Sequence, residues 1–429
     1  MKLGFVSLPF TGHLNPMAAL ARKMRSRGHE VVFIGIPDIE PSIRAAGLNF
    51  VPYSENEFPV GSLDNYLALI SRLHGLAAVQ KTNLHLTPDL AKAAFEHLPG
   101  LIKEIGVEAI VIDTLHRFLE LIPMALNIPC VHIWNTLPID GTGTTPACVY
   151  DWPHEDTPEA RTRNLEGLKE LGRMASSSLD LAKAYAVKAG LQIDWTNPAT
   201  AVPRLAVITQ TPKEFDLPGI PWPPQFHYAG PFHDSATHAP IPFPWEKLNG
   251  KPLIYASLGT LVNGLGHVYK TILEAVGKLS DVQVVLSIGR HIDLAGLEPI
   301  PQNTTVVRTA PQIELLERTR LCITHAGLNT TLESLAHGVP MVAIPIAYDQ
   351  PGISARIAYH GVGEFVDLDS LSVTNLSELI RKVLTNRSYA DRARYFKEVI
   401  AKTRGLDVAA DVVERVLQET STAPLSKNA

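Results

Sequence analysis

The chain has 429 residues, 45% of them hydrophobic, and a formal net charge of −5 from 38 Lys and Arg against 43 Asp and Glu. This is about three times a ~150-residue domain, so we expect two large domains with real hydrophobic cores. The lack of excess positive charge argues against nucleic acid as a partner, and no run approaches the ~18 apolar residues that membrane insertion requires.

The cysteines and the N-terminal residues bear on the cellular compartment in which the protein is expected. Cys130, Cys148 and Cys322 lie far apart without a CxxC motif, which excludes a disulfide scaffold and a structural zinc site. The run Met1–Val6 is too short for the apolar region of a signal peptide. We therefore expect a cytoplasmic protein, and a monomer.

The first half of the chain predicts alternating strands and helices. Leu3–Leu8 reads as a strand, Pro9–Pro16 as a loop, and Met17–Met24 as a helix that ends before Gly28. Continuous apolar runs follow, as expected for strands of a parallel sheet that is covered on both faces. These runs are Val31–Ile36, Ala109–Ile112, Cys130–Ile133 and Leu205–Ile208.

A proline-rich segment separates this half from the next. Eight prolines between Leu217 and Trp245 rule out helix and central strand there. Beyond them the strand pattern returns at Leu253–Ser257, Val282–Ser287, Thr305–Arg308, Leu321–Thr324 and Met341–Ile344. We predict an α/β protein of two doubly wound, Rossmann-like parallel-sheet domains. The predicted divisions are residues 1–230, a linker 231–245, residues 246–404, and a final helix and tail 405–429, disordered from Ser421.

Two such domains suggest a cleft between them, with ligands beyond the carboxyl ends of the strands. The segment after Leu321–Thr324 fits a nucleotide sugar. Asn329 or a neighbour caps a helix that Gly338 ends, and a helix start binds anions such as pyrophosphate. His325 can add a donor to the phosphates, and Glu333 can accept two ribose hydroxyls. Asp349 and Gln350, after the next strand, offer an acceptor and an amide to further hydroxyls.

This ordered stretch resembles the nucleotide-sugar signature of the family 1 glycosyltransferases, the UDP-glycosyltransferase superfamily of GT-B architecture. Gly12-His13-Leu14-Asn15-Pro16 is similar to the opening motif of that family, so the resemblance spans both halves. Bacterial macrolide and carotenoid (zeaxanthin-type) glucosyltransferases resemble the chain most.

The resemblance implies roles for individual residues. Gln312 and the backbone near Ala310 would face the base, and Glu333 would hold the ribose. Asp349 and Gln350 would hold the sugar hydroxyls. The pyrophosphate would contact His325, Gly327, Asn329 and Thr330, together with Ser257 and Thr260 of a second phosphate loop. Thr309 departs from the family, which often has an aromatic residue there to stack on the base, and this weakens the preference for uracil over thymine.

His13 follows the first predicted strand and suits the role of general base, because a hydroxyl is a poor nucleophile while protonated. A buried carboxylate should orient its ring, and by resemblance that carboxylate is Asp113. His116 and Glu120 are nearby alternatives. A single displacement would invert the anomeric centre.

No metal is expected, because a helix start and side-chain donors can stabilise the diphosphate. Asp367-Leu368-Asp369 matches the DxD motif of metal-dependent glycosyltransferases, but it lies in the wrong part of the chain. We expect no cofactor besides the co-substrate UDP-glucose.

Aromatic residues of the first half predict an apolar acceptor pocket for an alcohol or phenol. The candidates are Phe10, Phe58, Tyr66, Phe118 and Trp134. The helical spacing of Tyr66, Leu69, Ile70 and Leu73 is more typical of a core than of a binding pocket.

The sequence thus favours transfer of glucose from UDP-glucose to a hydroxyl of a lipophilic small molecule (phenolic, terpenoid, carotenoid or macrolide). The alternatives are a TDP-sugar-dependent natural-product glycosyltransferase, a lipid-carrier GlcNAc transferase and a non-catalytic nucleotide-sugar binding protein. A nicotinamide dehydrogenase is disfavoured, because Pro9–Pro16 lacks the GxGxxG motif.

Overall fold

A computed structural model describes residues 1–196, 205–234, 241–290 and 292–422 of the chain. Residues 235–240 of the predicted linker and 423–429 of the predicted tail lie outside these ranges. Within them, no helix combines the length and apolar character needed to cross a membrane. Cys130, Cys148 and Cys322 are buried free thiols, so the expected absence of a disulfide between them is confirmed.

The first sheet has seven strands in the order β3-β2-β1-β4-β5-β6-β7, and every neighbouring pair is parallel. This order reverses at β1 and β4, which is the doubly wound arrangement. The strands are β1 (Lys2–Val6), β2 (Glu30–Gly35), β3 (Asn49–Pro52), β4 (Ala109–Asp113), β5 (Cys130–Trp134), β6 (Ala206–Thr209) and β7 (Phe226–Tyr228).

The second sheet has six parallel strands in the order β10-β9-β8-β11-β12-β13, which reverses at β8 and β11. The predicted fold class, two doubly wound α/β domains, is confirmed. The strands are β8 (Leu253–Ser257), β9 (Gln283–Ser287), β10 (Thr304–Val307), β11 (Thr319–Thr324), β12 (Met341–Ala343) and β13 (Gly363–Phe365).

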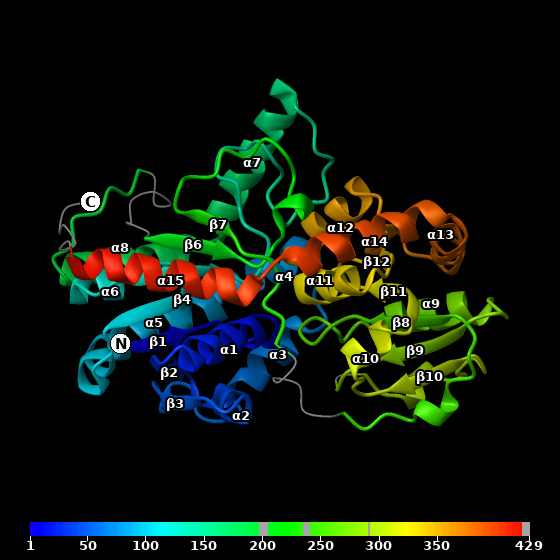
Figure 1. Ribbon diagram of the computed structural model, residues 1–429, viewed down its shortest axis with the longest axis horizontal. Coiled ribbons are helices and arrows are strands. Elements are labelled where there is room, and N and C mark those ends of the chain that lie inside the picture. Colours follow the sequence, from blue (N-terminus) through cyan, green and yellow to red (C-terminus); the bar gives the residue numbers. More distant parts are fainter. Residues whose placement is uncertain (197–204, 235–240, 291, 423–429) are drawn as a thin grey trace.

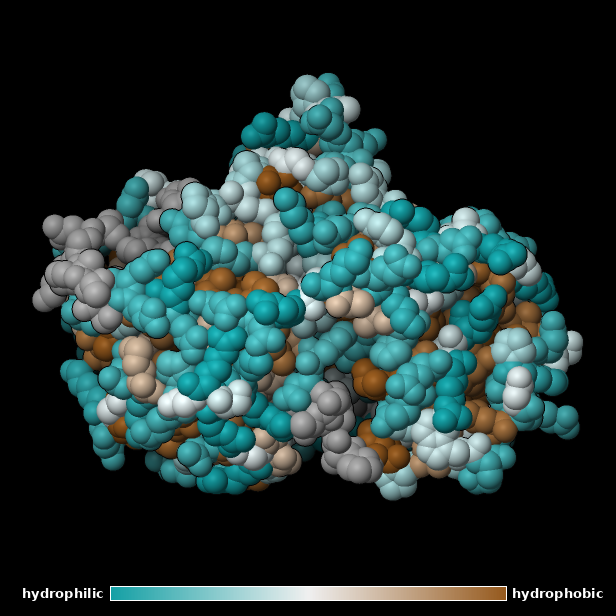
Figure 2. Space-filling model, in the orientation of Figure 1, coloured by the Kyte–Doolittle hydropathy of each residue, from teal (hydrophilic) through white to brown (hydrophobic). Residues whose placement is uncertain are grey.

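Helices cover both sheets, and the two lobes lie side by side in Figure 1. The helices are α1 (Thr11–Ser26), α2 (Glu40–Ala45), α3 (Ser62–Ile70), α4 (Gly75–Leu84), α5 (Leu86–Ile105), α6 (Leu121–Leu126), α7 (Pro158–Met174), α8 (Ser176–Lys188), α9 (Gly266–Gly277), α10 (Gln312–Leu316), α11 (Leu328–His337), α12 (Gln350–Tyr359), α13 (Val373–Thr385), α14 (Arg387–Lys402) and α15 (Gly405–Thr422). The face drawn in Figure 2 is mainly hydrophilic, with apolar side chains in separate small patches.

The prediction of a loop through Pro9–Pro16 is wrong in its second part. Helix α1 begins at Thr11 after the extended residue Phe10, and it contains Pro16. Proline in a helix removes the hydrogen bond to the carbonyl four residues earlier, here that of Gly12. This carbonyl instead accepts a hydrogen bond from Nδ2 of Asn329 at 3.0 Å.

Two segments cross between the lobes. Phe215, which follows β6, is fully buried and packs on His360 and Phe396 of the second half. Helix α15 (red in Figure 1) returns to the first lobe, where it contacts α1 and β6 and contributes buried Ala409 and Val413 to that lobe's core. It runs two residues into the tail expected to be disordered from Ser421.

Candidate active site

A cavity of about 600 Å³ lies between the two lobes, within the size range of small-molecule sites. Its walls include the segments that follow β1 and β4 of the first sheet and β8 and β11 of the second. These are the points at which each strand order reverses, where doubly wound sheets bind ligands. The predicted catalytic residue His13 and the residues predicted to bind the nucleotide sugar therefore line the same cavity, from opposite lobes.

His13 and Asp113 form a close polar contact in this region. Nδ1 of His13, in the first turn of α1, lies 2.6 Å from Oδ2 of Asp113 at the end of β4. The Asp113 side chain is fully buried and that of His13 is 12% exposed. Because the carboxylate accepts the Nδ1 proton, Nε2 is the nitrogen left to receive a proton in the cavity that His13 lines.

Burial and charge act on this pair in opposite directions. Burial lowers the pKa of His13, but the charge and hydrogen bond of Asp113, with the charge of Asp349, raise it above its ordinary value. Burial raises the pKa of Asp113, yet His13 and the Leu115 backbone amide hold that pKa below its ordinary value. Asp113 therefore remains ionised and stabilises a protonated imidazole.

The alternative partners of His13 lie elsewhere. His116 is 2% exposed and Glu120 is 5% exposed, and neither lines the cavity. Burial lowers the pKa of His116 to about 4. The geometry thus pairs His13 with Asp113.

Helix α11 begins beside the cavity with Gly327 as its N-cap, so the cap is a neighbour of Asn329. It ends at Gly338 in the left-handed conformation, as predicted. Asn329 donates to the Gly12 carbonyl and accepts from Nε2 of Gln210, both at 3.0 Å. A predicted phosphate ligand is therefore already hydrogen-bonded to the opposite lobe.

His325 sits between two glycines. A Cβ added at Gly259 or at Gly327 would come within 2.5 Å of its Nε2. Burial lowers its pKa to about 4, against an interaction with the Ser257 backbone, so the ring is neutral. His325 lines the cavity as a close-packed, neutral imidazole.

The residues predicted to face the base and ribose form one hydrogen-bonded group. Nε2 of Gln312 donates to Oε2 of Glu333 at 2.5 Å and to the Thr330 hydroxyl at 3.3 Å. The Tyr255 hydroxyl donates to Oε1 of Gln312 at 3.0 Å. Burial raises the pKa of Glu333 to about 7, against the hydrogen bond from Gln312.

Asp349 and Gln350 are buried at the cavity wall and already bind backbone groups. Oδ2 of Asp349 accepts from the Leu137 amide of the first lobe at 3.1 Å. Oε1 of Gln350 accepts from the amides of Ile346 and Ala347 at 2.8 and 2.9 Å. The remaining predicted donor ligands, Ser257, Thr260 and Ala310, also line the cavity.

Of the five aromatic acceptor candidates, only Phe10 lines the cavity. Phe58 and Tyr66 stack on each other, and the Tyr66 hydroxyl donates to Asp89. Phe118 contacts Trp195, and Trp134 is buried at the end of β5. The apolar wall of the first lobe instead comes from Val79, Ile139, Val149 and Leu171.

The sequence analysis did not predict several residues that line the cavity. Asn135 and Gln210 directly follow β5 and β6, and Gln210 donates to the Asn135 carbonyl at 3.2 Å. Their position directly after predicted strands, like that of His13 after the first strand, was the signal that could have found both. Tyr348, whose hydroxyl lies 2.9 Å from that of Thr82, and Arg117 gave no comparable signal.

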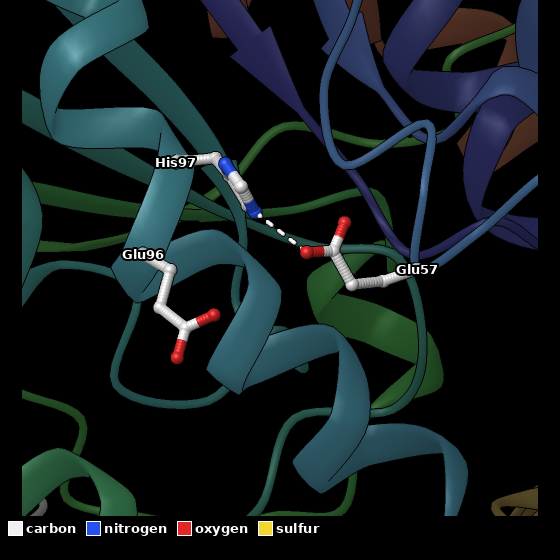
Figure 3. Close-up of side chains that lie close together, drawn as sticks. All are labelled: Glu57, Glu96 and His97. Carbon is white, nitrogen blue, oxygen red and sulfur yellow. Dashed lines mark hydrogen bonds and ion pairs between the residues drawn. The ribbon is translucent and has the colours of Figure 1, made fainter.

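Glu57, Glu96 and His97 each offer a metal-ligating atom within 4.8 Å of the others, away from the cavity lining. Figure 3 draws an interaction only between His97 and Glu57, whose Nε2 and Oε1 are 3.2 Å apart. Both carboxylates are exposed, and such groups are common without a metal. Asp367 and Asp369 of the DxD match also lie outside the cavity lining.

Two facing Rossmann-type domains with a cavity at their switch points define the GT-B class of glycosyltransferase architecture. In agreement, a solved structure described as the glycotransferase of kitacinnamycin superposes with a TM-score of 0.75 at 23% identity, over 97% of this chain and 98% of its own.

Sequence comparisons identify proteins that are similar to this chain. Residues 214–419 match the model described as UDP-glucoronosyl and UDP-glucosyl transferase. Zeaxanthin glucosyltransferase of Pantoea ananas is 28% identical over 96% of this chain and 95% of its own. NDP-glycosyltransferase YjiC of Bacillus subtilis (strain 168) is 25% identical over 98% of both chains. These matches confirm the predicted resemblance to the family 1 glycosyltransferases, and the relatives are named as sugar-transferring enzymes.

Proposed function

We propose that the enzyme transfers glucose from UDP-glucose to a hydroxyl of a lipophilic small molecule, without a metal and with inversion at the anomeric carbon. The observation that carries the proposal is the His13–Asp113 contact of 2.6 Å, which faces the same cavity as Gln312, Glu333 and the start of α11. This arrangement supports a general base on one wall of the cavity and a nucleotide-sugar site on the opposite wall.

The names of the relatives bear on the substrates. A zeaxanthin glucosyltransferase acts with a glucosyl donor on an apolar alcohol, which favours glucose and a lipophilic acceptor here. The natural-product class, whether phenolic, terpenoid, carotenoid or macrolide, follows by the same analogy. The apolar cavity residues Val79, Ile139, Val149 and Leu171 suit such an acceptor.

In the proposed reaction, Nε2 of His13 takes the hydroxyl proton as the acceptor oxygen attacks the anomeric carbon from the face opposite the diphosphate. The carbon–oxygen bond to the diphosphate breaks, and UDP leaves with the electron pair. Asp113 keeps the imidazole in the required tautomer and stabilises its positive charge. One displacement inverts the centre.

Charge on the departing diphosphate would be stabilised by amides at the start of α11, by Thr260, and by the single N–H of neutral His325. The second N–H of the Asn329 amide would bind a phosphate, while the first keeps its bond to the Gly12 carbonyl. These donors make a metal unnecessary in the proposal. Asp349 would contact sugar hydroxyls through Oδ1, and Gln350 through Nε2, because Oδ2 and Oε1 already accept hydrogen bonds from backbone amides.

A TDP-sugar is the second candidate donor, because Thr309 provides no ring to stack on the base. Thr309 lines the cavity beside Ala310 and Gln312. The relative named an NDP-glycosyltransferase is also consistent with a less selective base site.

The test is a mass-spectrometric screen of phenol, terpenoid, carotenoid and macrolide alcohols with UDP-glucose and TDP-glucose, using wild type and His13→Ala. We expect a mass gain of one hexose with the wild type and loss of at least about 100-fold in rate with the variant. Proton NMR of the product should show the inverted β-anomer. Normal turnover by His13→Ala, or a retained α-anomer, would contradict the mechanism.

A further inference from the structure

Arg117 lines the cavity without a counter-ion. It lies four residues after Asp113, in the turn that follows β4, and Leu115 of the same turn also lines the cavity. Among the described residues, no carboxylate pairs with its guanidinium, and the one charge interaction acting on it comes from Cys148. Burial lowers the pKa of Arg117, yet an arginine remains charged at ordinary pH.

Cys148 cannot neutralise this charge. Burial and the neighbouring Asp349 raise the pKa of its thiol to about 12, so it is protonated at ordinary pH. A partly buried cation without a charged partner is unfavourable unless another group supplies the counter-charge. Because the guanidinium lines a substrate cavity, a substrate is the natural source.

Apart from Glu314, which is exposed, the other arginine and the carboxylates of the cavity wall already have protein partners. Arg308 donates to the Gly289 and Ile292 carbonyls. Asp234 pairs with Arg22 at 3.2 Å, while the bonds of Glu333 and Asp349 are described above. Within the part of the chain that the structure describes, Arg117 therefore differs from Arg308 in having no hydrogen bond or ion pair to a protein group.

An apolar wall lies beside it. Val79, Leu171, Ile139 and Val149 belong to one hydrophobic cluster from α4, α7 and the segment after β5. Val149 is adjacent in sequence to Cys148, the residue that interacts with Arg117. An apolar surface next to one guanidinium suits a molecule with an apolar body and an anionic end.

We infer that the acceptor is an amphipathic hydroxy acid whose carboxylate is held by Arg117 while its hydroxyl reacts at His13. The inference rests on the proposed function, and it narrows the acceptor class from lipophilic alcohols to those that carry an acid. Arginine is suited to this role, because its planar fork binds a carboxylate through two parallel hydrogen bonds. The acceptor is the favoured source of the carboxylate, because Arg117 and the apolar wall both belong to the first lobe.

The test compares two acids with their methyl esters: 4-hydroxycinnamate and 16-hydroxyhexadecanoate. The measured quantity is the ratio of kcat/KM for acid and ester with UDP-glucose. We expect the wild type to favour the acids and Arg117→Gln to reduce the ratio by about 10-fold or more, with Arg117→Lys retaining part of it. Arg308→Gln, which removes the same charge from the same cavity, should leave the ratio as in the wild type.

Three results would overturn the inference. The wild type could bind and use the acids no better than the esters, or Arg117→Gln could lower both equally and leave the ratio unchanged. Alternatively, the variant could change the preference for UDP-glucuronate over UDP-glucose instead, in which case the guanidinium serves a donor carboxylate.

A binding experiment separates this inference from the proposed function. Calorimetric titration of each acid and ester into wild type and Arg117→Gln, without donor, needs no turnover. Acid binding that depends on Arg117, in a protein that transfers no sugar, would retain the acid site and reject the proposed function. Transfer without such dependence would reject the acid site alone.

Discussion

The carbonyl of Gly12 accepts a hydrogen bond from Nδ2 of Asn329, which joins the first helix of one lobe to the start of α11 in the other. The bond is possible because Pro16 lacks the amide that would otherwise occupy this carbonyl. Gln210 donates to Oδ1 of Asn329 and so fixes which way its amide faces. A predicted phosphate ligand is thus oriented by two groups of the lobe that carries the proposed base.

Gln210→Ala should raise the KM for UDP-glucose about 5-fold with a smaller change in kcat. The variant removes the donor that orients Asn329, and a hydrogen bond of this kind contributes about 1 kcal/mol. Steady-state kinetics at saturating acceptor would measure the effect. Gln80→Ala, at an exposed glutamine of α4, serves as the control, and an unchanged KM in Gln210→Ala would reject the orienting role.

Asp113→Asn should reduce kcat by about 10²–10⁴-fold and move the acid limb of the pH–rate profile to lower pH. Asp113 holds the pKa of His13 above its ordinary value, against burial, so removing its charge lets that pKa fall. The base is then neutral, and active, down to a lower pH. The measurement is kcat/KM from pH 5 to 9, and an acid limb that stays in place would rule out this coupling.

UDP affinity should rise with pH and level off above about 7. The carboxyl of Glu333 has a pKa of about 7 in the free enzyme, and ribose hydroxyls favour its ionised form, so binding lowers that pKa and releases a proton. Calorimetry in buffers of different ionisation enthalpy would detect the release. Glu333→Gln should bind UDP more weakly at pH 8 and show little pH dependence. If the variant keeps the wild-type pH dependence, another group is responsible.

Gly327→Ala should destabilise the fold by about 1–3 kcal/mol, because the new Cβ would meet Nε2 of His325 at 2.5 Å. The backbone of Gly327, with φ −65° and ψ 139°, suits alanine, so the imidazole is the main obstacle. In a His325→Ala background the same change should cost much less. Urea unfolding of the four proteins measures this coupling, and additive effects would show that the imidazole is not the obstacle.

The buried ion pair between Arg356 of α12 and Asp216, which follows β6, should be sensitive to loss of one partner. Nη2 and Oδ1 are 2.8 Å apart, and the side chains are 3% and 2% exposed. Arg356→Met leaves a buried charge and should cost about 3–5 kcal/mol, while adding Asp216→Asn should recover part of this.

Urea unfolding would test this expectation. Arg394→Met breaks an exposed pair with Asp391 and should cost less than about 1 kcal/mol, which makes it the control. A cost equal to that of the control would show that the buried pair contributes little.

The strand pattern was predictable because the central strands are continuous apolar runs. The edge strands β3, β7 and β13 were missed, because their sequences NFVP, FHY and GEF are not continuous apolar runs. The start of α1 was misplaced, because Pro16 was taken as part of a loop, whereas the helix contains it.

The candidate site was likewise predictable in one part and not in another. Donor residues and His13 follow strand ends, so chain order alone brings them to the cavity. The aromatic residues do not: Phe58 and Tyr66 have the composition of a binding wall but pack on each other within the first lobe. Apolar side chains look alike in sequence whether they line a cavity or fill a core.

The return of α15 to the first lobe has a consequence for biosynthesis. Ala409 and Val413 belong to the core built around β1 and β4, so the segment synthesised first acquires its full interior only when the last helix has emerged from the ribosome. The second lobe, whose strands lie between Leu253 and Phe365, has all of its sheet available earlier. The N-terminal half expressed alone would leave the surface that α15 covers open to solvent and to other chains.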